Sequence, residues 1–225
     1  MTSDEIRSVF AGELRAAIED FLSLQHTDAN LTLATDRLRE ARGLLAGPTA
    51  PRYYEREVTS HPNKEAAFRS YLDETPFGGG HNPVSAPGTL ELHIDPARPS
   101  VTGVVTAGRV YEGPARCLHG GYVAGLFDHF LGMTQHAFNL SQGSSVMAAT
   151  RELIIRYKAP TPLDTELTFH AWIEDVDERT LRGHGTCHAG DVLTATAEGH
   201  FVKVGVERIL STDPDGFNAP PPATG

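Results

Sequence analysis

The sequence has few cysteines, few basic residues and no long apolar run. Two cysteines among 225 residues are too few for a disulfide framework, which favours a reducing compartment. The formal net charge of −10 is unfavourable for binding nucleic-acid phosphates or anionic membrane surfaces. No stretch approaches the roughly 18 uninterrupted apolar residues of a membrane helix, and the first residues lack the pattern of a secretory signal. We therefore expect a cytoplasmic protein with neither nucleic-acid nor membrane partners.

The chain divides into four regions. Residues 1–47 predict a hairpin of two helices, because apolar residues recur at helical intervals and Thr2 and Glu5 stand at capping-box spacing. Residues 48–89 form an irregular connector rich in proline and glycine, with one short helix expected at 63–72. Residues 90–210 predict the main domain, and we expect the tail 211–225 to be disordered. We interpret the hairpin as a packing or oligomerisation element.

The main domain predicts one long helix among about six strands. The strands are expected at 90–95, 101–111, 148–158, 165–175, 179–189 and 193–204, and the helix at 119–138. Turn residues between the last three strands are typical of an antiparallel meander. The helix has apolar residues on every side, which indicates a buried helix. We therefore predict an α+β fold in which an antiparallel sheet wraps around one central helix, with an N-terminal helical extension.

Asp128 interrupts this otherwise apolar helix, and aspartate is seldom buried without a partner or a chemical role. The helix begins with His119-Gly120-Gly121, where bare backbone N–H groups at the positive end of the helix dipole can bind an anion or oxyanion. Gly121 and Asp128 are about 10–12 Å apart along the axis, too far to grip one carbonyl group together. If they cooperate, two copies of the chain must share each site. The residues alone leave a bland alternative, a strand-to-helix turn and a capping aspartate.

These residues, together with TRELIIRYKAP at 150–160, resemble the hotdog-fold acyl-CoA thioesterases, in the PaaI and Them-type branch of the 4-hydroxybenzoyl-CoA thioesterase superfamily. The resemblance covers roughly residues 77–204. It implies a hotdog fold, hydrolysis of an acyl-CoA to free acid and CoA, a place in fatty acid metabolism, and active sites at the interface of a homodimer or homotetramer. It implies no cofactor, because coenzyme A is part of the substrate. Gly113 stands where many PaaI-type enzymes carry Asn or Gln, which favours the Them-like variant.

The resemblance also implies a role for each site residue. Asp128 is expected to be the general base or the nucleophile. The backbone N–H of Gly121, together with Gly120, is expected to polarise the thioester carbonyl. His119 is expected to hold the loop before the helix and to orient the substrate, and Thr150 to position Asp128 or the attacking water.

Four further residues are candidates for substrate binding. Gly80-His81-Asn82-Pro83 resembles the Asn-Pro element of the Them-type proteins, which adds Asn82. Coenzyme A carries phosphates, so an acidic protein needs a local basic surface to bind it. The candidates for that surface are Arg151, Arg156 and Lys158, although each can equally be a solvated strand or turn residue.

Two other functions remain open. A hotdog enoyl-CoA hydratase or dehydratase would use a His with a carboxylate, but the two glycines after His119 favour attack on the carbonyl. A non-catalytic acyl-CoA-binding or sensing protein would use the hairpin as a regulatory arm. His184, Thr186 and His188 alternate on one side of a predicted strand, and we expect a polar outer face there and no metal site.

Overall fold

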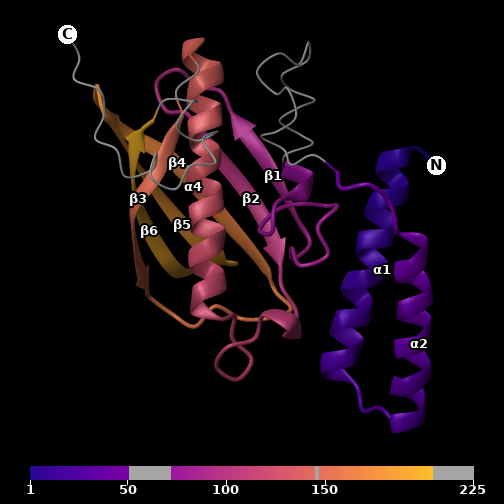
Figure 1. Cartoon of the computed structure of the whole chain (residues 1–225). Helices are drawn as coiled ribbons and strands as arrows, with labels where there is room; N and C mark the ends of the chain where they lie inside the picture. Colours follow the sequence, from indigo (N-terminus) through magenta and orange to yellow (C-terminus); the bar gives the residue numbers. More distant parts are fainter. Residues whose placement is uncertain (51–71, 145–146, 205–225) are drawn as a thin grey trace.

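The computed structural model describes residues 1–50, 72–144 and 147–204 (Figure 1). Its elements are α1 (Ser3–Ser23), α2 (Asp28–Leu44), β1 (Gly88–His93), β2 (Ser100–Thr106), η2 (Arg109–Tyr111), α4 (Gly120–Gln142), β3 (Ala148–Tyr157), β4 (Glu166–Val176), β5 (Thr180–Ala189) and β6 (Val192–Lys203). The short helix expected at 63–72, except its last residue, and the tail 211–225 lie outside the described residues.

The six strands form one antiparallel sheet in the order β1-β2-β4-β5-β6-β3. β4, β5 and β6 follow one another as the predicted meander, and β3 pairs with β6 at the edge of the sheet. The long helix α4 lies across one face of this sheet (Figure 1). The prediction of an antiparallel six-stranded sheet with one long helix and an N-terminal helical extension is confirmed.

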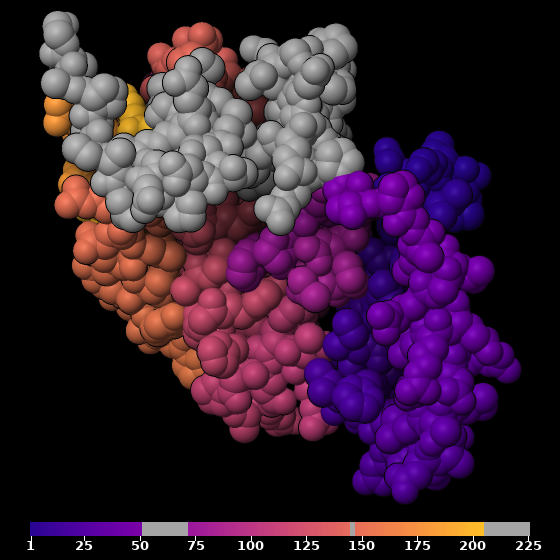
Figure 2. All heavy atoms as spheres, in the orientation of Figure 1, coloured from indigo at the N-terminus to yellow at the C-terminus, as the bar shows by residue number. Residues whose placement is uncertain are grey.

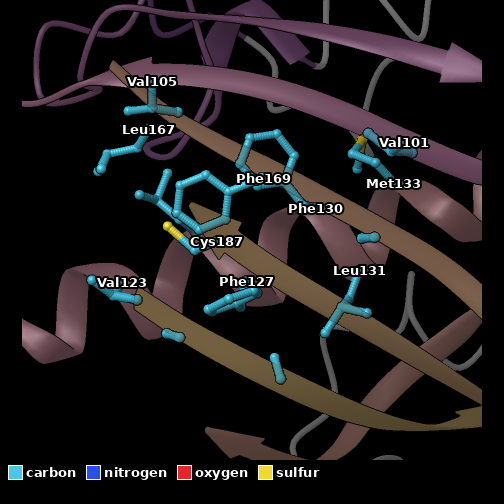
Figure 3. Packing of buried hydrophobic residues seen from close by; sticks show 14 of the residues in the cluster. Val101, Val105, Val123, Phe127, Phe130, Leu131, Met133, Leu167, Phe169 and Cys187 are labelled. Atoms are coloured by element: carbon cyan, nitrogen blue, oxygen red, sulfur yellow. The ribbon is translucent and has the colours of Figure 1, made fainter. Parts of the chain in front are cut away.

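The core lies between α4 and the sheet (Figure 3). The rings of Phe127 and Phe130 meet Phe169 of β4 at centroid distances of 5.2 and 5.0 Å. Gly103 of β2 lies directly beneath Phe130. A Cβ at this position would overlap the phenylalanine ring, so only glycine fits here. This close approach lets the helix sit low on the sheet, where burial of aromatic side chains supplies much of the stability.

The prediction that α4 is buried on all sides is wrong for the single chain. Nine residues of α4 are buried, but Gly121 and Asp128 on its other side are exposed. The composition of the helix explains the error. Gly125 and Gly132 also count as non-polar in a sequence pattern, yet a glycine has no side chain that requires burial. The sheet therefore supports the helix from one side and leaves an open face.

Figure 2 shows the helical hairpin as a lobe on the flank of the sheet domain. Thr2 and Glu5 form the predicted capping box at the start of α1. Only Ala11 of α1 is buried, and no residue of α2 is. The large apolar residues of the hairpin that remain exposed are Met1, Ile6, Val9, Phe10, Phe21, Leu22, Leu24, Leu33, Leu38, Leu44 and Leu45.

The strand predicted at 101–111 is shorter than expected, because β2 ends at Thr106 and η2 follows it. The cause lies in α1. The carboxylate of Glu19 accepts hydrogen bonds from the backbone N–H groups of Arg109 and Val110, at 3.1 and 3.3 Å. These two N–H groups donate to a side chain distant in sequence and not to a neighbouring strand, so the chain leaves the sheet at this point. The same contact attaches the hairpin to the sheet domain.

Candidate active site

His119 forms the N-cap of α4 and accepts hydrogen bonds from the N–H groups at its start. The ring nitrogen Nδ1 accepts a hydrogen bond from the backbone N–H of Gly121 at 3.0 Å. The carbonyl of His119 accepts from Tyr122 and Val123 at 2.9 and 3.1 Å. The N–H of Gly121, expected to face a substrate carbonyl, therefore donates to an exposed imidazole in this structure. A bond across two residues to an exposed side chain is one that an incoming acceptor can replace.

Asp128 and Thr150 meet on the open side of α4. The hydroxyl of Thr150 donates to the Oδ1 atom of Asp128 at 2.9 Å, and both residues are exposed. The structure therefore brings together the two residues that the resemblance paired. A β-bulge between Thr150 and Glu152 interrupts the β3–β6 register. Bulges commonly re-aim a side chain beside a functional site, and here Thr150 reaches the helix while Glu152 lies opposite His200.

Tyr157 makes a contact with the start of α4 that was not predicted from the sequence. Its hydroxyl donates to the carbonyl oxygen of Gly120 at 2.7 Å, from the last residue of β3. Thr150, near the start of the same strand, holds Asp128. One edge strand thus contacts both chemical features of α4, the glycines at its N-terminus and the carboxylate two turns later. Tyr157 lies within the motif at 150–160 that resembles the thioesterases, but alternation along a strand does not show which of its residues reaches a helix terminus.

A surface hollow of about 440 Å³ lies beside the N-terminus of α4. Its lining residues are Pro114, Cys117, Leu118, Gly120, Tyr157, Lys158, Ala159 and Pro160. Lys158 is the only one of the three predicted basic residues that lines it. The hollow is therefore an apolar surface with one cation at the end of α4 where the glycines lie.

The other two basic candidates lie elsewhere. Arg156 forms an ion pair with Glu198 of β6, and this contact lowers the pKa of the Glu198 carboxyl. Arg151 is exposed at the bulge of β3, where it lines a second hollow with Asp175 and Arg182. The three cations therefore do not form one basic patch, and phosphate binding by any of them stays a prediction.

Asn82 holds its own loop. Its side-chain amide donates to the carbonyl of Glu74 at 2.9 Å and accepts from the N–H of Val84 at 3.1 Å. Its backbone carbonyl accepts from Arg15 of α1 at 3.1 Å. The structure thus gives Asn82 a part in shaping the segment before β1, and its contact with a substrate stays a prediction.

Within residues 1–50, 72–144 and 147–204, no group of three or more His, Cys, Asp or Glu side chains has an arrangement suited to a metal ion. His184 stacks on Trp172 at a centroid distance of 6.0 Å and lies 2.5 Å from Glu174. Over the same ranges, the helices fall short of the length and apolarity needed to cross a membrane.

The chain is similar to known thioesterase superfamily proteins. Residues 117–196 match the family model of the thioesterase superfamily. A solved thioesterase superfamily protein is 28% identical, with a TM-score of 0.70, over 87% of this chain and 90% of the other. No curated protein matches the chain. The resemblance to thioesterases is therefore confirmed: the family model covers α4, β3, β4, β5 and the first part of β6, and the similar solved structure covers most of the chain.

Two less similar structures share only part of the chain. A Streptococcus pneumoniae protein described as a hypothetical thioesterase, solved with coenzyme A, is 17% identical, with a TM-score of 0.44, over 52% of this chain and 87% of the other. The PaaI protein of E. coli is 16% identical, with a TM-score of 0.43, over 52% of this chain and 80% of the other. In both comparisons the shared part is about half of the present chain.

Proposed function

We propose that the protein is an acyl-CoA thioesterase, which hydrolyses an acyl-CoA to a free acid and CoA. The observation that carries this proposal is the pairing of Asp128 with Thr150 on the open side of α4, in a chain whose residues 117–196 match the thioesterase superfamily. Thioester hydrolysis needs a carboxylate that accepts a proton from water or attacks the carbonyl carbon itself. It also needs donors for the oxyanion.

In the proposed reaction Asp128 takes a proton from a water molecule as the water attacks the carbonyl carbon. The carbonyl oxygen becomes an oxyanion, and the carbon–sulfur bond then breaks to release the thiolate of CoA, which takes up a proton. The hydroxyl of Thr150 occupies one lone pair of Oδ1 and so fixes the orientation of the carboxylate. Direct attack by Asp128, through an acyl anhydride that water later hydrolyses, uses the same groups.

The oxyanion would bind at the start of α4. The N–H of Gly121 donates to the ring of His119, so a substrate oxygen at that N–H takes the place of this ring nitrogen. The hydrogen bond from Tyr157 to Gly120 fixes the adjacent peptide unit. Donors held in place before the reaction stabilise a developing charge without the cost of reorganising.

We further propose that each site uses two copies of the chain, with the glycines from one and Asp128 from the other. The two features are about 10–12 Å apart on one helix. β3 is an edge strand that pairs only with β6 among the described strands, and it lies beside the open side of α4. A second copy placed against this edge by two-fold symmetry brings each Asp128 toward the other copy's helix terminus.

The direct test is release of free thiol from a panel of acyl-CoAs. The wild type should hydrolyse at least one of them, and Asp128→Asn should lower kcat/KM by about 10³-fold, within the range for loss of a general base. Thr150→Val should have a smaller effect. The control is Asp191→Asn in the exposed β5–β6 turn, which should match the wild type. Hydration of an enoyl-CoA without thiol release, or tight acyl-CoA binding without turnover, would contradict the proposal and favour one of its alternatives.

The shared site has a separate test. Asp128→Asn and Gly121→Val should each be inactive alone, since one lacks the base and the other obstructs the donor. After subunit exchange, half of the dimers are mixed and each mixed dimer has one intact site, so activity should return to about a quarter of the wild type. No recovery after proven exchange would count against sites shared between two copies.

A further inference from the structure

The segment 72–86, which precedes β1, covers one side of α4 through two interlocking contacts. The ring of Phe77 sits on Gly125, where a Cβ would overlap it. One residue later, Gly78 sits on His129, and a Cβ at Gly78 would lie 2.7 Å from the Nε2 atom of the histidine. In one contact the helix supplies the glycine, and in the other the segment does. Together they fix the position of the segment along α4.

This position places Phe77 within one helical turn of Asp128, because its ring sits on Gly125. Gly125 and Asp128 are three residues apart, and residues at that spacing are neighbours on a helix surface. Phe77 is half-buried while Asp128 is exposed. The phenylalanine ring therefore stands at the boundary between the covered side of the helix and the open side that carries the carboxylate.

Polar contacts hold the same segment from two other directions. The hydroxyl of Tyr122, on α4, accepts from the N–H of Ala86 at 2.9 Å, and its ring lies 5.4 Å from that of Phe77. The side chain of Arg15, on α1, donates to the carbonyls of Asn82 and Ser85 at 3.1 and 2.7 Å. A wall fixed in this way can select substrates by size, because it does not yield to a larger group.

We propose that Phe77 determines acyl specificity, by forming the wall of the acyl site beside Asp128 and limiting the width of the group bound there. This inference rests on the proposed thioesterase function and deepens it. It assigns a role to a residue outside the region that matches the family model, and it predicts that the natural substrate has a slender acyl group at the carbons nearest the thioester.

The experiment compares kcat/KM for benzoyl-CoA with that for acetyl-CoA in the full-length protein. Phe77→Ala should raise the benzoyl-to-acetyl ratio by about tenfold or more, the usual scale for a change of pocket size. Phe21→Ala is the matched control, because Phe21 is 60% exposed on α1, and its ratio should equal that of the wild type. Phe77→Leu, which keeps an apolar contact, replaces Phe77→Ala if thermal melting shows that the alanine variant is unfolded.

A second variant tests the contact itself. Gly125→Ala should push the ring off its seat and change the ratio by about twofold or more, whereas in the Phe77→Ala background it should change nothing. Gly12→Ala is its control, because no atom lies within 4 Å of a Cβ there. An unchanged ratio in folded Phe77 variants overturns the inference alone. If the wild type hydrolyses no acyl-CoA, the proposed function fails and this inference fails with it.

Discussion

The two sides of α4 have different roles, and the boundary between them falls between neighbouring residues. Phe127 is 1% exposed and packs against Phe169. Asp128 is exposed, and among the described residues its carboxylate accepts a hydrogen bond from Thr150 alone. A carboxylate so close to a dense core would be costly if it pointed inward. The helix avoids this cost by turning 100° per residue. Stability and the proposed chemistry are thus separable by changing one residue or the next.

The largest effect is expected on the packed side. Phe127→Ala should lower the free energy of unfolding by about 3–5 kcal/mol, because it removes a fully buried ring and leaves a cavity between α4 and the sheet. Asp128→Asn should change it by less than about 0.5 kcal/mol, since the side chain is exposed. Urea denaturation followed by circular dichroism measures both values. Equal losses in the two variants would show that the two sides are not separable.

His129 follows Asp128 and belongs to the packed side. Burial lowers the pKa of its imidazole to about 4, below its value of about 6.5 in an unfolded chain. The unfolded chain therefore binds the extra proton first as the pH falls. The contribution of His129 to folding stability is therefore fully present above pH 6.5 and is lost progressively down to about pH 4, by about 3 kcal/mol in total.

The variant His129→Gln isolates this contribution. Unfolding free energies at pH 7.5, 6.5, 5.5 and 4.5 should fall more steeply for the wild type than for the variant, and the difference between the two should be confined to the range below pH 6.5. Parallel curves would mean that His129 is not held neutral by burial. Because the ring also contacts Gly78, the variant should be compared in slope and not in absolute stability.

The sequence predicted the helices and strands better than it predicted which of their faces are covered and which distant residues they contact. The strands and α4 follow from side-chain periodicity, and the capping box at Thr2 follows from local spacing, because both depend on neighbours along the chain. The open side of α4 did not follow, because glycine counts as non-polar whether or not anything covers it. The contact between Thr150 and Asp128 was implied by the resemblance alone, since it joins residues 22 positions apart. Asn82 shows the reverse case, in which a motif marks a residue whose side chain shapes a loop.

Tyr157 provides the smallest expected effect and the sharpest test of the open side. Tyr157→Phe removes the hydroxyl that donates to the Gly120 carbonyl, but leaves the ring in place. Because the residue is 55% exposed, loss of this bond should cost about 1 kcal/mol or less in unfolding free energy. If the bond fixes the oxyanion donors, kcat should fall several-fold with KM little changed, since the donors act on the transition state more than on the bound substrate.

Thr32→Val removes an exposed hydroxyl-to-carbonyl hydrogen bond of 2.8 Å on α2, and it should leave both constants at the wild-type values. A fall in kcat for the α2 variant as large as that for Tyr157→Phe would mean that the effect is a general loss of stability, and that β3 does not hold the start of α4 for the reaction.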